Sequence, residues 1–174
     1  MGDGNGNKAE ARTSRVLSTY HLFRYCAEVE VNTLTRAFSI SPKTAQRDIA
    51  LLERAGVLRA EFDRTCAAYI PVSLEIEPMA EEQNATRRKY MEKLRRICRF
   101  MAALEDCVGS PIALYRSLFP ALTDRTRQRD FAQLSTLGYV LHYSGAFAGE
   151  PGGWVVEIPP AFGLDTIPKD TKWW

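Results

Sequence analysis

The sequence contains little of what most catalytic and metal sites require. Its two histidines, His21 and His142, lie far apart, and its four cysteines form no close Cys-x-x-Cys pair and keep no metal-ligand spacing from a histidine. A glycine-rich phosphate loop is missing, and the scattered carboxylates suggest no constellation of nucleophile, base and orienting group. We therefore expect no enzymatic activity, no metal and no cofactor, and we expect reduced, mostly packed cysteines.

Long hydrophobic runs are missing as well. No apolar stretch approaches the roughly 20 residues that span a bilayer, and residues 1–12 lack the apolar core of a signal peptide. These absences predict a cytoplasmic protein without a membrane partner. The excess of positive over negative charge is also small, since 23 basic and 21 acidic residues give a formal net charge of only +2. Nucleic-acid binding must therefore be judged from where the charges lie.

The chain does have enough hydrophobic residues, 45% of 174, for real cores, and it contains an internal repeat. The segment KTAQRDIA at 43–50 recurs as RTRQRDFA at 125–132, 82 positions later. Further pairs at offsets of 82 or 81 are Leu52 and Leu134, Gly56 and Gly138, Cys26 and Cys107, and Phe38 and Phe119. Because the matches extend over a whole supersecondary unit, duplication of one domain explains them most simply.

The first copy has the pattern of three helices followed by a β-hairpin. Ser41 and Pro42 mark the start of the third helix, because serine caps free N–H groups and proline at the first helical position needs no N–H. Gly56 fits its end as a left-handed residue. The predicted elements are a helix over 14–26, a short strand over 28–31, a helix capped by Asn32, the third helix, and wing strands over 57–62 and 66–72.

The third helix is predicted to bury one face, because Ala45, Ile49 and Leu52 recur at helical spacing. In the second copy Arg127 replaces Ala45, so that helix is either rotated slightly or carries an extra outward arginine. The other elements predicted for the second copy are a helix over 96–107, a helix over 112–119, a third helix capped by Thr123, and strands over 139–143 and 154–158.

These patterns predict an α+β, mainly α, protein with two tandem winged helix-turn-helix domains joined by a long helix. The predicted boundaries are a disordered tail over 1–12, a first domain over 13–75, a helical linker over 76–94, a second domain over 95–162 and a C-terminal tail over 163–174.

The linker is apolar on one stripe and basic elsewhere. Its stripe fits two alternatives equally, packing against the protein's own domains or forming a homodimer; the residues are Tyr90, Leu94, Ile97, Met101 and Leu104. Its basic residues fit either the phosphate backbone of DNA or a solvated face that pairs with Glu81 and Glu82. The basic residues are Arg87, Arg88, Lys89, Lys93, Arg95, Arg96 and Arg99.

The third helix of a helix-turn-helix enters the major groove and presents the residues near its start to base edges. The residues that fit this role are Lys43, Thr44, Gln46 and Arg47 in the first copy and Arg125, Thr126, Gln128 and Arg129 in the second. A merely solvated helix face is the alternative, but it does not explain why glutamine and arginine recur at exposed positions. Arg64 on the first wing fits a phosphate or minor-groove contact. We expect Asp48 and Asp130 to pair with basic residues.

Residues 38–58 resemble the N-terminal winged helix of bacterial DeoR-family and WYL-domain regulators. The resemblance rests on Ser41, Thr44, Arg47, Asp48, Leu52 and Gly56. It implies that Thr44 and Arg47 contact DNA. No sugar-phosphate-binding or WYL-like segment follows, so no small-molecule effector domain is recognised.

We therefore predict a nucleoid-associated, sequence-specific transcriptional regulator whose partner is double-stranded DNA. Two alternatives remain open. Tandem winged helices also occur in chromosome-segregation adaptors, which bind proteins, and in plasmid- or phage-type replication initiators.

Overall fold

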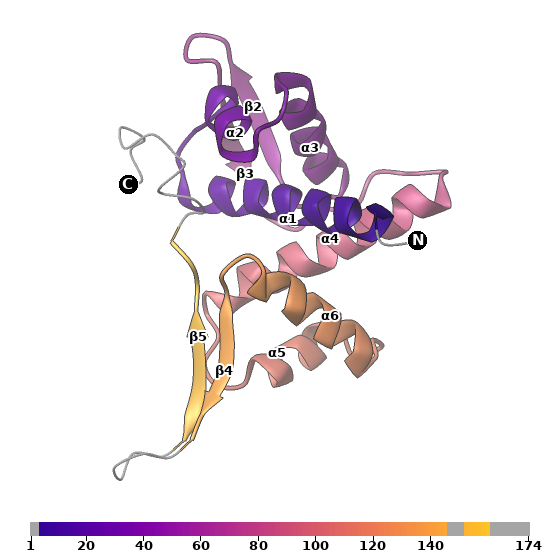
Figure 1. The fold of residues 1–174 in the computed structure, drawn as a ribbon, viewed down its shortest axis with the longest axis vertical. Helices are drawn as coiled ribbons and strands as arrows, with labels where there is room; N and C mark the ends of the chain where they lie inside the picture. Colours follow the sequence, from indigo (N-terminus) through magenta and orange to yellow (C-terminus); the bar gives the residue numbers. More distant parts are fainter. Residues whose placement is uncertain (1–3, 146–151, 161–174) are drawn as a thin grey trace. The chain divides into compact units, whose positions relative to one another are not determined.

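The computed structural model describes residues 4–145 and 152–160 (Figure 1). Within these residues six helices alternate with small antiparallel sheets, which confirms the α+β, mainly α, class. The described chain divides into two compact units between Cys98 and Arg99, inside one helix. The elements are α1 (Gly4–Tyr25), β1 (Val29–Glu30), α2 (Val31–Phe38), α3 (Pro42–Arg54), β2 (Arg59–Asp63), β3 (Ala68–Ser73), α4 (Ala85–Leu104), α5 (Pro111–Leu118), α6 (Asp124–Ser135), β4 (Val140–Ser144) and β5 (Gly153–Glu157).

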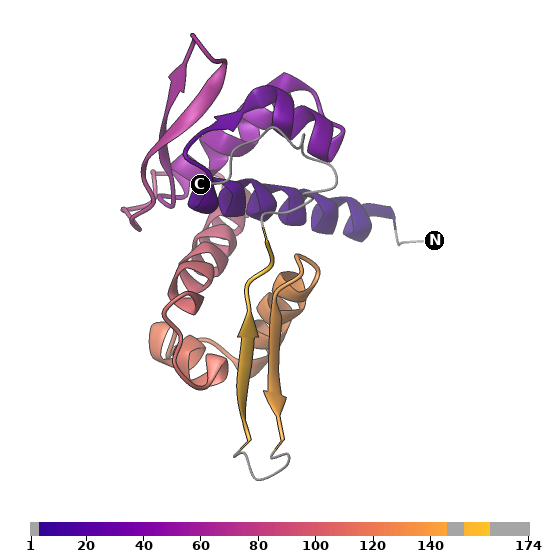
Figure 2. The same ribbon diagram turned by 90° about the vertical axis from the view of Figure 1, so that its left-hand side faces the viewer.

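The first unit places a three-stranded antiparallel sheet, in the order β1-β3-β2, beside α1, α2 and α3 (Figure 2). The two-residue strand β1 pairs with β3, so that Val29 lies opposite Tyr69. The β2–β3 hairpin forms where the wing was predicted, and at its turn the Thr65 N–H donates to the Asp63 carboxylate at 2.7 Å. This side-chain to backbone hydrogen bond stabilises the tight turn between β2 and β3.

Helix α1 supplies the centre of the first core. The helical spacing of Val16, Tyr20, Phe23 and Ala27 predicts one apolar stripe on this helix. Tyr20 and Phe23 are at most 1% exposed, as this stripe predicts, and they share the core with Leu34, Ile49 and Leu52. Burial of each such side chain stabilises the fold by about 1.5–3 kcal/mol.

Three sequence predictions for the first unit are wrong. Helix α1 begins at Gly4, where a disordered tail over 1–12 was expected. Helix α2 begins at Val31 with Glu30 at its N-cap and no side-chain cap, so Asn32 is not the capping residue. Ala27 is exposed, because α1 ends at Tyr25, before the last position of the predicted apolar stripe.

The helix predicted over the linker begins only at Ala85, because residues 77–82 bind the end of α3 instead. The Glu77 N–H donates to the Gly56 carbonyl at 2.9 Å, and the Ala80 N–H donates to the Arg54 carbonyl at 2.8 Å. These bonds satisfy carbonyls that the end of a helix leaves open, and they use donors that a linker helix would need. We call residues 77–82 the strap.

The second unit repeats the order of helices and hairpin with two strands among its described residues, β4 and β5. Its core stacks Phe100 on Phe131, with ring centroids 5.3 Å apart, and sets Tyr115 edge-on to both rings. Gly138 has a φ of +89° just beyond α6, as Gly56 has +67° just beyond α3. Figure 1 shows the β4–β5 hairpin extending beyond α5 and α6.

No helix in the described ranges combines the length and the apolar character that crossing a membrane requires. The four cysteines are free thiols. Cys26 and Cys98 are buried, and burial raises the pKa of the Cys26 thiol to about 12, so it stays protonated. Cys107 is partly buried, and Cys66 on the first hairpin is the exposed exception to the expectation of mostly packed thiols.

Candidate nucleic-acid interface

The starts of α3 and α6 have the same capping geometry. Ser41 and Thr123 precede the two helices with identical dihedrals, φ −75° and ψ 154°. The Ser41 hydroxyl accepts from the Thr44 N–H at 3.2 Å, and the Thr123 hydroxyl accepts from the Thr126 N–H at 3.3 Å. Both predicted N-caps are confirmed, and they give α3 and α6 equivalent first turns.

The hydroxyls of Thr44 and Thr126 belong to these caps. The Ser41 and Thr44 hydroxyl oxygens are 3.0 Å apart, and those of Thr123 and Thr126 are 3.1 Å apart. Both threonines are only half-exposed. Sequence reasoning placed them among the residues that read bases, whereas the structure gives each hydroxyl a partner within its own helix.

Replacing Ser41 or Thr123 with alanine should destabilise the protein by about 1 kcal/mol, because one N–H of the first turn loses its acceptor. Urea unfolding of each variant measures the loss. Ser41→Asn is the matched control, since asparagine is an equally good cap, and its stability should stay close to wild type. Equal losses for alanine and asparagine would show that the cap hydrogen bond is not the cause.

Six side chains of the predicted reading set lie exposed near these helix starts: Lys43, Gln46, Arg47, Arg125, Gln128 and Arg129. In the described part of the chain, none of the six makes a hydrogen bond or ion pair with the protein. Other arginines are engaged, since Arg15 pairs with Asp48 and Arg54 with Glu82. Cationic and amide groups at a helix N-terminus, where the dipole is positive, favour an anionic ligand.

On the inner sides of α3 and α6, a buried carboxylate bonds each helix to a neighbouring helix. Asp48 accepts from the Arg15 Nε at 2.6 Å, which confirms its predicted basic partner. Asp130, 1% exposed, accepts from the Tyr115 hydroxyl at 2.6 Å, while the basic partner predicted for it stays a prediction. Both acids face inward, so they add no negative charge to the exposed side of their helices.

Arg127 does not extend the basic face of α6. Its guanidinium lies over the Phe131 ring, 5.6 Å from the centroid, and its Nε donates to Asp124 at 3.2 Å. Arg116 donates to the same carboxylate at 3.2 Å, and hydrogen bonds from Arg116 and Arg127 hold the pKa of Asp124 below its usual value. Arg127 thus covers the core where Ala45 is buried in the first unit.

On the first wing, Arg64 is exposed and its side chain makes no hydrogen bond or ion pair with the described residues, so it is available to a ligand. Its neighbour Asp63 is held by the turn, and hydrogen bonds with Thr65 lower the pKa of that carboxyl. The corresponding tip of the second wing, residues 146–151, lies outside the described residues.

Several arginines of the basic linker contact other residues of the protein. Arg95 donates to the carbonyls of Ala55 and Glu77 and so binds the end of α3, a role that the sequence analysis missed. Arg87 pairs with Glu82, as one of the two interpretations predicted. Arg88 lies 3.9 Å from Glu92. The linker therefore offers DNA fewer free charges than its composition suggests.

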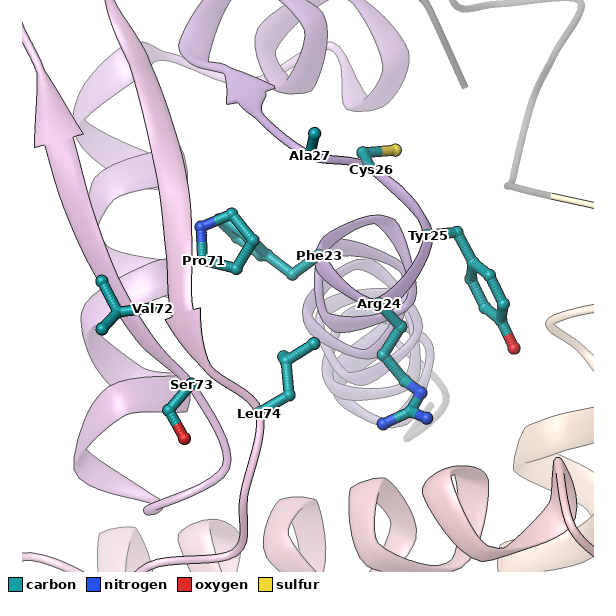
Figure 3. Close-up of a pocket in the computed structure, with 9 residues that line it drawn as sticks. All are labelled: Phe23, Arg24, Tyr25, Cys26, Ala27, Pro71, Val72, Ser73 and Leu74. Atoms are coloured by element: carbon teal, nitrogen blue, oxygen red, sulfur yellow. The ribbon is translucent and has the colours of Figure 1, made fainter. Parts of the chain in front are cut away.

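Two pockets of the described units are lined by residues other than the six exposed side chains at the starts of α3 and α6. A pocket of about 360 Å³ lies between the end of α1 and β3, where Phe23 and Pro71 face each other and Val72 points away (Figure 3). A second, of about 400 Å³, lies between α6 and β4 and is lined by Phe131 and Tyr139. Within the described ranges no histidine, cysteine and carboxylate side chains gather in a group able to hold a metal ion.

Comparisons with protein-family models, with curated proteins and with solved structures gave no match to this chain. The resemblance to DeoR-family and WYL-domain regulators therefore stays a prediction from the residues of α3.

Proposed function

We propose that the protein is a sequence-specific DNA-binding transcriptional regulator with two winged helix-turn-helix domains in tandem. The element order of the first unit, helix, strand, two helices and hairpin, supports this fold, as does the sheet order β1-β3-β2. The second unit repeats the helices and the hairpin. In this proposal α3 and α6 are the recognition helices.

One observation carries the proposal: exposed, unpartnered side chains of the same kinds stand at the starts of both helices. Gln46 and Gln128 can each pair bidentately with adenine, and Arg47 and Arg129 can each pair bidentately with guanine. Because these side chains have no partner within the described protein, a ligand can bind them without first breaking a hydrogen bond or ion pair of the fold. The major groove supplies both the base edges and the flanking phosphates.

Phosphate contacts should come from the same surfaces. Lys43 and Arg125 stand in the first turns of their helices, and Arg64 stands at the tip of the first wing. Contacts of this kind position a protein on the duplex without reading its sequence, and they make affinity fall as salt rises.

Selection of binding sites from random duplexes tests the proposal. We expect the full chain to enrich a defined sequence. Arg47→Ala and Arg129→Ala should each weaken binding to it by about 1–3 kcal/mol and relax the preference at one base position. Both side chains are exposed and unpartnered, so neither change should unfold the protein.

Lys89→Ala is the matched control, because it removes an exposed cation of α4 that lies on neither recognition helix. Its base preference should equal that of the wild type. Unchanged enrichment by both arginine variants would reject α3 and α6 as the reading elements.

A protein-interaction adaptor is the second candidate, and exposed apolar residues on β3 favour it. Ile70 is 40% exposed and Val72 is 43% exposed, and their spacing puts both on one face of the hairpin. A chain that ignores every duplex at low salt would support this candidate over DNA binding.

A further inference from the structure

Four exposed positions of α3 and α6 correspond, three of them with identical residues and the fourth with lysine in α3 and arginine in α6. On α3 the face consists of Lys43, Gln46, Arg47 and Ala50, and on α6 of Arg125, Gln128, Arg129 and Ala132. All eight residues are exposed. The spacing i, i+3, i+4, i+7 puts each set on one side of its helix. We call these sets the α3 face and the α6 face.

The backbone that carries the two faces matches as well. Each helix begins after a hydroxyl residue with φ −75° and ψ 154°, and each cap hydroxyl bonds the N–H three residues on, at 3.2 and 3.3 Å. Corresponding side chains therefore leave their helices at the same depth from the N-terminus and in the same direction relative to it.

The inner sides of the two helices have changed more than these faces. Asp48 and Leu52 recur as Asp130 and Leu134, but Ala45, 1% exposed, corresponds to Arg127, whose side chain is 13% exposed, and the buried Leu51 corresponds to Gln133. The buried Ile49 corresponds to the larger Phe131. Packing normally restrains buried positions more than exposed ones, because a core tolerates few changes of volume or polarity. Folding alone therefore gives no reason for an exposed face to be retained while its buried side varies.

Base recognition does give such a reason. Glutamine pairs with the N6 and N7 of adenine, and arginine with the O6 and N7 of guanine. The small Ala50 and Ala132 leave room for the helix to approach the base edges. Two faces of the same chemistry and the same geometry select the same bases.

We propose that α3 and α6 read the same short base sequence, so that the duplex bound by one chain carries this element twice. Each copy contains an adenine read by glutamine and a guanine read by arginine. This inference rests on the proposed function, and it holds whether the two elements run in the same or in opposite directions along the duplex.

Selection from random duplexes with the full-length chain, followed by alignment of the enriched sequences, tests the inference. We expect the same element twice in each enriched duplex. Two unrelated elements, or a single element, would overturn it while leaving DNA binding intact. Enrichment of no sequence would instead contradict the proposed function itself.

Variants with matched changes locate each element. Arg47→Ala should lose the guanine preference in one element, and Arg129→Ala should lose it at the corresponding base of the other, each with about a tenfold or greater loss of affinity. Lys89→Ala should leave both preferences unchanged, because a cation of α4 that touches phosphate changes affinity but reads no base. If the two arginine variants relax non-corresponding bases, the two helices read different sequences and the inference is wrong.

Discussion

Gly56→Ala should destabilise the protein by about 3 kcal/mol, the combined effect of left-handed backbone strain and overpacking. Gly56 has a φ of +67°, and an added Cβ would lie 2.4 Å from the Glu77 carbonyl oxygen and 2.8 Å from that of Pro78. Both atoms belong to the backbone and cannot rotate away. Urea unfolding followed by helix circular dichroism measures the effect.

Two other glycines provide the controls. Gly138 occupies the corresponding place after α6 with a φ of +89°, and its added Cβ would meet two side-chain carbons of Pro159, at 3.2 and 3.7 Å. Gly109 has a φ of +100° with nothing within 4 Å, so Gly109→Ala isolates the backbone strain, about 1–2 kcal/mol. We expect the loss to increase from Gly109 through Gly138 to Gly56. Equal losses at all three positions would show that the strap does not crowd the end of α3.

Asp48→Asn should destabilise the first unit by about 3 kcal/mol, because it removes one partner of a largely buried ion pair. The Asp48 side chain is 3% exposed and accepts from the Arg15 Nε at 2.6 Å, while Arg15 is 21% exposed. The asparagine keeps the size of the side chain but leaves the guanidinium without its counter-charge. We place the loss at the lower end for buried pairs, because water reaches part of Arg15.

Glu92→Gln is the control for a surface ion pair. Arg88 and Glu92 are 3.9 Å apart and about half exposed, so their separation should change stability by at most about 0.5 kcal/mol. Chemical unfolding of the two variants side by side measures both losses. A loss for Asp48→Asn as small as that for Glu92→Gln would mean that the Arg15–Asp48 pair does not hold α3 in place.

Structural features that depend only on a few adjacent residues could be predicted from the sequence. Ser41 and Pro42 start α3, and Gly56 follows it with a positive φ, because capping and left-handed conformations depend on local chemistry. The repeat supported a further prediction, because Thr123 corresponds to Ser41 and could therefore be recognised as the cap of α6. The exposed side of α3 followed from helical spacing alone.

Features that depend on distant residues could not be predicted. Residues 77–82 have helix-compatible composition, yet Glu77 and Ala80 give their N–H groups to carbonyls at the end of α3. Arg95 belongs to a basic run that fitted either the phosphate backbone or a solvated face, and it binds the same end of that helix. For Arg127 the sequence left a rotated helix or an outward arginine as alternatives, and the side chain packs on Phe131. In the first two cases a partner far away in the sequence decides where the group lies, whereas the partners of Arg127, Asp124 and Phe131, are its neighbours on α6.

The central claim, that exposed arginines of α3 and α6 touch base edges, is tested most directly by changing one atom of the DNA. Replacement of the relevant guanine by 7-deazaguanine, in a duplex enriched by selection, removes the N7 acceptor that an arginine fork requires. Wild-type protein should lose affinity on this change, whereas Arg47→Ala or Arg129→Ala, whichever reads that guanine, should be insensitive to it. If wild type and both variants lose affinity equally, neither arginine contacts the base, and the account is contradicted.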